Sequence, residues 1–197
     1  MRVSMQCVIA AALLFSSSAR AAIELEQITP AKTVYVAGID FDGPATFGPV
    51  NFDVTGILTA LSVPDGLGGQ ELGLGCNASD FSGFTSGSIA LVGRGNCNYT
   101  VKTQFAQDAG AIGVLIADYD DGSLMPPGGG SPTITIPAFR TSFALRPGFF
   151  VAALRGDSIF RMSTVPEGET WVLMLGGFGG VGLAIRRRNF KCSFASS

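Results

Sequence analysis

The residues that could do chemistry in this chain are a lysine, two groups of aspartates and a few cysteines. The 197 residues include no histidine, so the commonest general base and the commonest metal ligand are both absent. Nucleophile pairs of the Ser-His or Cys-His type are excluded for the same reason. Lys102 could serve a serine as a base, but we expect it on the exposed face of a helix. The sequence therefore predicts a protein that is not an enzyme and needs no cofactor.

Clustered carboxylates occur in two places, Asp40 with Asp42 and Asp118 with Asp120 and Asp121. Calcium takes six to eight oxygen ligands, and neither stretch has the EF-hand spacing or its terminal glutamate. We expect these residues in turns and expect no metal site, with calcium binding as the alternative.

The first 21 residues have the pattern of a secretory signal peptide. Arg2 precedes an apolar run over residues 8–15, and Ala19 and Ala21 form a small-residue cleavage pattern. We expect cleavage after Ala21 and export of the chain. The alternative is a buried N-terminal helix.

A second apolar segment lies near the C-terminus, at residues 171–185. Fifteen uncharged residues reach about 22 Å as a helix, against a hydrocarbon core of roughly 30 Å. Glu167 and Glu169 precede the segment and three arginines follow it, which orients the preceding chain outside the cytoplasm. We expect one transmembrane helix with its arginine cluster at 171–188, a linker at 157–170 and a short tail at 189–197. A core helix is the alternative, although its glycines would weaken it in water.

Three features occur here in a fixed order: Val165-Pro166-Glu167, the Gly-rich apolar segment with Trp171, and Arg186-Arg187-Arg188. This order resembles the PEP-CTERM sorting signal. Gly168 stands where that motif has its second proline, and residues 189–197 extend past the arginines. The resemblance implies that an exosortase, a membrane protease, is a partner. It also implies that the protein is held in the inner membrane before release to the cell surface or extracellular matrix.

Between these ends the chain is acidic and contains two of the four cysteines. Residues 22–164 have seven Lys and Arg against thirteen Asp and Glu, a net charge of −6, so nucleic acid is excluded as a partner. An exported compartment is oxidising, which favours a disulfide between Cys76 and Cys97. Asn77 and Asn98 each begin a glycosylation sequon, and the sequence does not decide whether they are modified.

Short β-branched or alternating runs predict strands in this region. They lie at residues 33–37, 50–54, 88–92, 112–117 and 133–136. The clearest helix spans residues 99–109, with Asn98 as its cap, an apolar face formed by Val101, Phe105 and Ala109, and Gly110 as its stop. A β-α-β passage inside a largely β region predicts a mixed β/α domain.

These elements carry a second resemblance, over about 80 residues. Its main features are Gly75-Cys76, the run Gly87-Ser-Ile-Ala-Leu-Val-Gly-Arg94-Gly95-Asn-Cys97, Lys102, Ala109-Gly110-Ala111 and Ile136-Pro137. The region resembles a protease-associated (PA) domain. The resemblance implies a swivelling β/β/α or β-sandwich-like fold with few short helices, whose core we place at 63–156 after an N-terminal β segment at 22–62. PA domains of this family are non-catalytic lids, inserts or substrate-docking units.

The loop at residues 124–132 is the stretch most suited to contacts. Met125, Pro126 and Pro127 lie in a Pro/Gly-rich run that cannot form regular structure. It is either an interaction loop or a plain surface connector. We expect an exported, membrane-anchored, non-catalytic protein that binds a protein or polysaccharide. The alternative is an accessory subunit that docks substrates for, or shields, a separate surface protease.

Overall fold

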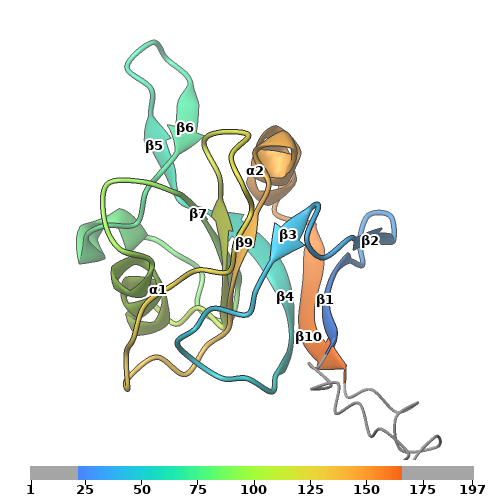
Figure 1. Cartoon of the computed structure of the whole chain (residues 1–197). Helices are drawn as coiled ribbons and strands as arrows, with labels where there is room; N and C mark the ends of the chain where they lie inside the picture. The colour runs from blue at the N-terminus through green and yellow to red at the C-terminus, as the bar shows by residue number, and fades with distance from the viewer. Residues whose placement is uncertain (1–21, 166–197) are drawn as a thin grey trace, which may run out of the picture. The chain divides into compact units, whose positions relative to one another are not determined.

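An eight-stranded sheet runs through residues 22–165, the part of the chain that the computed structural model describes. In spatial order its strands are β2 (Thr33–Tyr35), β1 (Ala22–Gln27), β10 (Ile159–Val165), β4 (Asp53–Ala60), β7 (Ile89–Gly93), β8 (Gly113–Ala117), β9 (Ala138–Thr141) and β3 (Phe41–Asp42). A separate hairpin, β5 (Ser62–Pro64) with β6 (Gln70–Leu72), projects from the body of the domain (Figure 1). The mixed β/α class expected from the sequence is confirmed.

The centre of the sheet is parallel. Strands β4, β7, β8 and β9 run in one direction, whereas β1, β2, β3 and β10 pair antiparallel. Every residue of β7 and β8 is buried, as expected for parallel strands that are covered on both faces. The carboxyl ends of these four strands therefore meet at one edge of the sheet.

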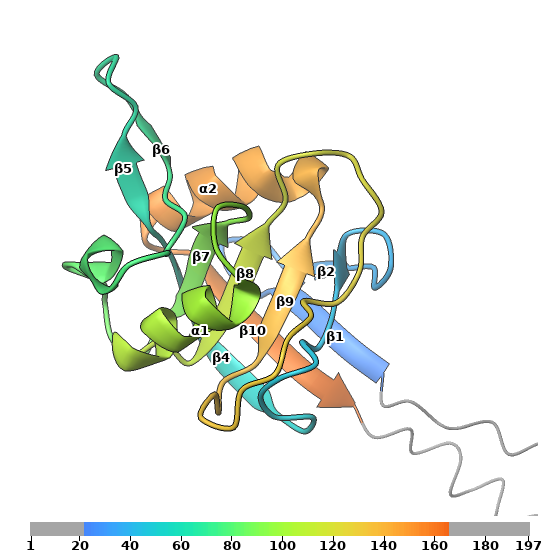
Figure 2. The ribbon, with the colours of Figure 1, turned by 60° about the vertical axis from the view of Figure 1, so that its left-hand side comes forward.

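Two ten-residue helices cover opposite faces of this parallel centre (Figure 2). Alternate residues of a strand point to opposite faces, and the two buried clusters divide accordingly. Ile89 and Leu91 pack with Phe149 of α2 (Arg146–Arg155), whereas Ala90 and Val92 pack with Ala106 of α1 (Tyr99–Asp108). Single 3-10 turns η1 (Ala78–Phe81) and η2 (Phe143–Leu145) complete the helical structure of the described residues.

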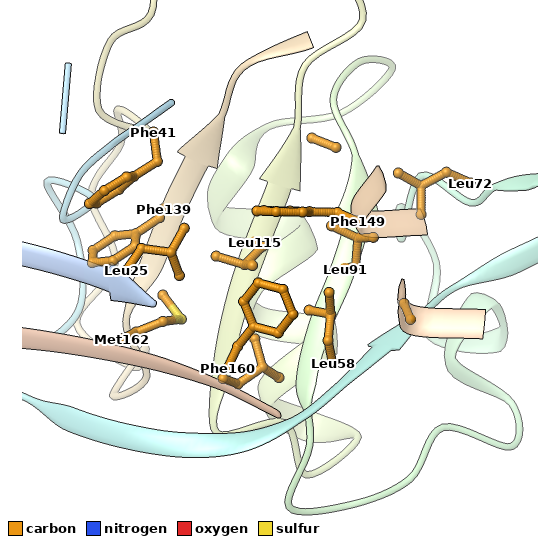
Figure 3. Packing of buried hydrophobic residues seen from close by; sticks show 13 residues of the cluster. Leu25, Phe41, Leu58, Leu72, Leu91, Leu115, Phe139, Phe149, Phe160 and Met162 are labelled. Atoms are coloured by element: carbon orange, nitrogen blue, oxygen red, sulfur yellow. The ribbon is translucent and has the colours of Figure 1, made fainter. Parts of the chain in front are cut away.

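The larger cluster is rich in aromatic rings and joins strands from distant parts of the sheet (Figure 3). Phe149 meets Phe160 edge-on with ring centroids 5.1 Å apart, and Phe41 lies 5.0 Å from Phe139. Leu25 of β1 belongs to the same cluster. The sheet is thus curved enough for strands near its two ends to share one core, as its right-handed twist permits.

The helix expected at residues 99–109 is confirmed, but its inward face is not the expected one. Asn98 occupies the N-cap position without a side-chain cap hydrogen bond, and Gly110 follows the helix with φ of +88°. The buried residues are Lys102, Thr103 and Ala106. The expected apolar face of Val101, Phe105 and Ala109 is only half-buried, and Phe105 and Ala109 pack at the margin of the smaller cluster.

Several boundaries differ from the sequence expectations. The run at 133–136 is not a strand; β9 begins at Ala138 instead, and β4 extends to Ala60 rather than ending at Val54. Strand β10 and the helix α2 were not expected, and β1 was expected only as part of an N-terminal β segment at 22–62. Because β10 is hydrogen-bonded between β1 and β4, part of the segment expected as a linker at 157–170 belongs to the sheet.

The described residues, 22–165, lie in one compact unit. Within the described residues, no helix has the length and apolar character needed to cross a membrane. The segment expected to do so, at 171–188, lies outside the described residues, as do the expected signal peptide and its cleavage residues Ala19 and Ala21.

Candidate functional site

The four parallel strands end at one edge of the sheet, and the loops that leave this edge carry most of the candidate side chains. The strands end at Ala60, Gly93, Ala117 and Thr141. In open sheets of parallel strands, ligands bind in the crevice outside these carboxyl ends. This edge is therefore where a site is expected on topological grounds.

A buried carboxylate joins two of the loops. Asp118 directly follows β8 and is 1% exposed; it accepts hydrogen bonds from Arg94 Nη1 and Arg140 Nε, each at 2.7 Å, and Arg140 Nη2 also contacts it. Burial alone would raise the pKa of Asp118, but the bonds from the two arginines outweigh it and hold the pKa below its ordinary value. These three charged side chains form a cluster of ion pairs that connects the carboxyl ends of β7, β8 and β9.

Arg94 is the partly exposed member of this cluster. Its guanidinium lies 4.8 Å from the centre of the Tyr119 ring and 3.5 Å from the Asp120 carboxylate. The next residue, Gly95, has φ of +111°, so the turn after β7 requires glycine. Asp120 accepts from the Gly122 backbone, and Asp40 accepts from Val36, which confirms the turn role for these two aspartates. The same expectation is wrong for Asp42, which lies in β3, and for Asp118, which is buried between two arginines.

The expected disulfide is present. Cys76 and Cys97 are bonded with their Cα atoms 5.8 Å apart, and they tie the segment before η1 to the turn after β7. The Asp80 carboxylate accepts from the backbone N–H groups of Cys76, at 2.8 Å, and Asn77, at 3.1 Å. The short loop that carries Cys76 is therefore held at both ends.

Lys102 is buried, and the expectation that it lies on an exposed helix face is wrong. Its side chain is 0% exposed, and its Nζ donates to the carbonyl oxygen of Leu74 at 2.6 Å and lies 3.4 Å from Cys76 Sγ. Burial lowers the pKa of Lys102 to about 8, partly opposed by the charge of Asp80. The amine is placed beneath the disulfide loop and supports its backbone.

A cavity of about 360 Å³ opens beside the disulfide. Its polar lining comes from the hairpin, the disulfide loop, the turn after β7 and the start of α2: Glu71, Cys76, Asn77, Asp80, Asn96 and Arg146. The N–H at Nη1 of Arg146 donates to the carbonyl oxygen of Asp118 at 3.3 Å. The cavity is thus bordered by the loops of the same carboxyl edge and lies next to the buried ion pair.

The loop with Met125, Pro126 and Pro127 does not line this cavity. Met125 is 58% exposed, but Pro127 is buried. Thr46 donates its backbone N–H to the carbonyl oxygen of Pro127 and exchanges two hydrogen bonds with Gly129 through its hydroxyl. A short strap from another part of the chain therefore fixes the loop, and Met125 is its exposed large apolar side chain.

The remaining expected site residues lie at or beyond the end of the described chain. Val165 is the last residue of β10. Pro166, Glu167 and the arginines at 186–188 fall outside the described residues. Among residues 22–165, no group of three or more Cys, Asp or Glu side chains is placed to hold a metal ion.

Sequence reasoning missed Arg140, Arg146 and the burial of Asp118. Each is a charged residue directly within or after a strand, or at the start of a helix. A charge at the carboxyl end of a buried parallel strand was the feature that could have indicated Asp118 and Arg140, whereas Arg146, at the start of α2, had no such indication. Glu71 and Asn96 had no comparable indication, since they lie in a hairpin and a turn.

Comparison with known proteins agrees with the fold. The PA domain family model matches residues 54–145. The chain is 44% identical over 64 residues to an aminopeptidase of Pseudomonas aeruginosa (strain UCBPP-PA14), and 38% identical over 65 residues to a PII-type proteinase of Lacticaseibacillus paracasei. These segments cover 32% and 33% of this chain, but only 12% and 3% of the two relatives.

A solved structure extends the likeness beyond the matched sequence. The aminopeptidase from Aneurinibacillus sp. strain AM-1 superposes with a TM-score of 0.55 at 26% identity, over 73% of this chain and 30% of that chain. The superposed part is therefore a fraction of the aminopeptidase. The match at 54–145 begins within β4, earlier than the core expected from residue 63. Residues 54–145 of this chain are a PA domain.

Proposed function

We propose that this chain is a non-catalytic binding protein whose PA domain holds segments of polypeptide. The proposal rests on one observation: the lysine, aspartate and cysteine side chains at the carboxyl edge are all bonded to other groups of the fold. Lys102 is bonded to a carbonyl, Asp118 is bonded to two arginines, and Cys76 is bonded to Cys97. Each of these groups stabilises the fold and is not free to act as a base or nucleophile. We therefore assign the cavity lining a binding role and no catalytic one.

The relatives support polypeptide as the ligand class. The matched segment occurs in an aminopeptidase and in a PII-type proteinase, two proteins named for action on polypeptides. In each of them it is a minor share of the chain. A module shared by such proteins is suited to holding a chain near the place where it is cut.

The proposal is tested with the full chain, purified in mild detergent. An array of random twelve-residue peptides and an array of oligosaccharides are probed in parallel, and hydrolysis of leucine p-nitroanilide and of casein is measured with an aminopeptidase as positive control. We expect peptide spots and no hydrolysis above the blank. Hydrolysis by the purified chain would overturn the non-catalytic role, and binding confined to oligosaccharides would overturn the ligand class.

A second candidate is an accessory subunit that docks substrates for, or shields, a separate surface protease. The same relatives favour it, because their matched segments accompany peptidases in one chain. Recovering the tagged chain from cells with and without protease inhibitors distinguishes the two. A protease recovered in fixed proportion supports the accessory role, whereas its absence under both conditions counts against it.

We also propose that the protein is exported and membrane-anchored, with the PA domain outside the cytoplasm and an exosortase as its processing partner. The support is the sequence pattern at 1–21 and 165–188. Because β10 ends at Val165, a truncation that begins at Glu167 leaves the sheet complete. We expect this truncation to move the protein from the membrane to the soluble fraction. If the truncated protein stays in the membrane pellet, the anchor is elsewhere.

A further inference from the structure

We propose that the cavity beside Cys76 binds a short peptide in its zwitterionic form, with the peptide carboxylate on Arg146 and its amino group on Glu71. This deepens the proposed function and rests on it, since it names the chemistry that the cavity recognises. The cavity is a separate feature from the Met125 loop that the sequence singled out. The cavity forms where the hairpin, the disulfide loop and the start of α2 come together.

The size and position of the cavity suit a small ligand. Its volume of about 360 Å³ lies at the low end of the range of roughly 300–1,000 Å³ for small-molecule sites. It opens at the carboxyl edge of the parallel strands, where ligands of open α/β sheets bind. A dipeptide or tripeptide, or the end of a longer chain, matches a space of this size.

Two opposite charges border the cavity without neutralising each other. Among the described residues, neither Arg146 nor Glu71 forms an ion pair. Arg146 uses one N–H, toward the carbonyl oxygen of Asp118, and a guanidinium has five N–H groups in all. Its remaining donors are suited to a carboxylate, and Glu71 supplies an acceptor for an ammonium group.

The third charge at the cavity, Asp80, is already engaged. Its carboxylate accepts from the backbone of Cys76 and Asn77, and its charge favours the protonated form of the buried Lys102. The Asp80 side chain therefore shapes the loop. This leaves one free positive and one free negative group, which is the charge pattern of a zwitterion.

The rest of the lining favours a peptide over a neutral sugar. Asn77 and Asn96 offer amide groups that can both donate and accept. Val63, Leu72 and Leu74 supply an apolar surface for a side chain. The lining includes no aromatic ring, so the cavity has no flat surface for a sugar to stack on.

The disulfide makes the site rigid before a ligand arrives. Cys76 lines the cavity, and its bond to Cys97 fixes the wall that carries Asn77 relative to the turn that carries Asn96. Lys102 holds the same segment from below through Leu74. A rigid wall lowers the entropy lost on binding, which matters for a ligand with few contacts.

The test uses the isotope-labelled full chain in detergent and three forms of the tripeptide Ala-Leu-Ala: free, N-acetylated and C-amidated. Binding is followed by 1H–15N NMR. We expect the free form to shift the backbone signals of residues 71–77 and 96. Arg146→Gln weakens binding of the free and acetylated forms about tenfold and leaves the amidated form unchanged. Glu71→Gln weakens the free and amidated forms and leaves the acetylated form unchanged.

Arg155→Gln is the matched control, because Arg155 is an exposed arginine at the other end of the same helix and does not line the cavity. It should bind all three forms as the parent does. If the free tripeptide binds but Arg146→Gln and Glu71→Gln leave its affinity unchanged, the cavity assignment is overturned and polypeptide binding stands. If no tripeptide form binds although the twelve-residue array is positive, the cavity proposal fails alone. If the array is also negative, the proposed function fails with it.

Discussion

Lys102 donates from its buried Nζ to the carbonyl oxygen of Leu74 at 2.6 Å, and this contact ties α1 to the segment that leads into the disulfide. A lysine in this environment is held at a cost, because burial disfavours its charged form and lowers its pKa to about 8. The contact orders the wall of the candidate site from beneath. It does so with a side chain that sequence analysis placed in solvent.

The first prediction concerns the pH dependence of stability at this position. Lys102 has a pKa of about 8 in the folded chain and an ordinary value of 10.5 when unfolded. Between these values the unfolded chain binds more protons, so the contribution of Lys102 to stability rises with pH. We expect the unfolding free energy of the parent minus that of Lys102→Met to increase by about 1 kcal/mol or more from pH 8 to pH 10.

The measurement is urea unfolding of both proteins at pH 7, 8, 9 and 10. Taking the difference cancels the other titrating groups, which the two proteins share. Between pH 7 and pH 8 the difference should change much less than between pH 8 and pH 10, because at pH 7 the lysine is protonated in both states. A difference that is flat across the whole range would show that Lys102 titrates as an exposed lysine does.

The second prediction concerns the buried ion pair. Asp118→Asn leaves Arg140, whose side chain is 4% exposed, without a carboxylate, and breaking a buried pair in this way costs about 3–5 kcal/mol. We expect a loss of that size in chemical unfolding at pH 7. Because the pKa of Asp118 is lowered in the folded state, the advantage of the parent should be present above pH 4 and shrink as the pH falls further.

Asp53→Asn is the control for this variant. Asp53 bonds Arg161 on the outer side of the sheet, where both side chains are well exposed. Solvent screens such a pair, so Asp53→Asn should lower the unfolding free energy much less than Asp118→Asn does. If the two variants lose equal amounts of unfolding free energy, burial does not make the Asp118 ion pairs more important for stability than an exposed pair.

The third prediction concerns the glycine that follows α1. A Cβ on Gly110 would lie 2.3 Å from Ser86 Oγ and 2.9 Å from Ser86 Cβ, and φ there is +88°. Gly83 has nearly the same φ, +80°, but open space around it. We expect Gly83→Ala to cost about 1 kcal/mol from backbone strain and Gly110→Ala to cost at least twice as much in thermal and urea unfolding. Similar losses for both would rule out the steric contact as a contribution.

The fourth prediction concerns the strap that holds the Met125 loop. The Thr46 hydroxyl donates to the carbonyl oxygen of Gly129 at 2.8 Å and accepts its N–H at 2.9 Å. Thr46→Val keeps the shape and removes both bonds, so the Gly129 amide should exchange its hydrogen about tenfold faster. Thr46→Ser keeps the hydroxyl and should exchange as the parent does. Unchanged exchange in Thr46→Val would show that other contacts hold the loop.

The sequence predicted the β-α-β centre of the fold because its patterns are local. The apolar runs that became β7 and β8 and the helix between them follow one another within 30 residues, and Gly110 separates helix from strand. The pairing of β1 with β10 was not predicted because the two strands lie far apart in the sequence. Ala22 pairs with Val165, and no local pattern records a contact across that separation.

By itself, the sequence determined the class of the domain, the disulfide and the PA resemblance, because cysteine identity, glycine positions and apolar runs are properties of short segments. Only the tertiary structure decided which charges are buried and which remain free. Asp118 meets Arg94 and Arg140 because three parallel strands end at one edge. The candidate cavity likewise exists only where the hairpin, the disulfide loop and α2 meet, since a site built from distant loops has no signature in any one of them.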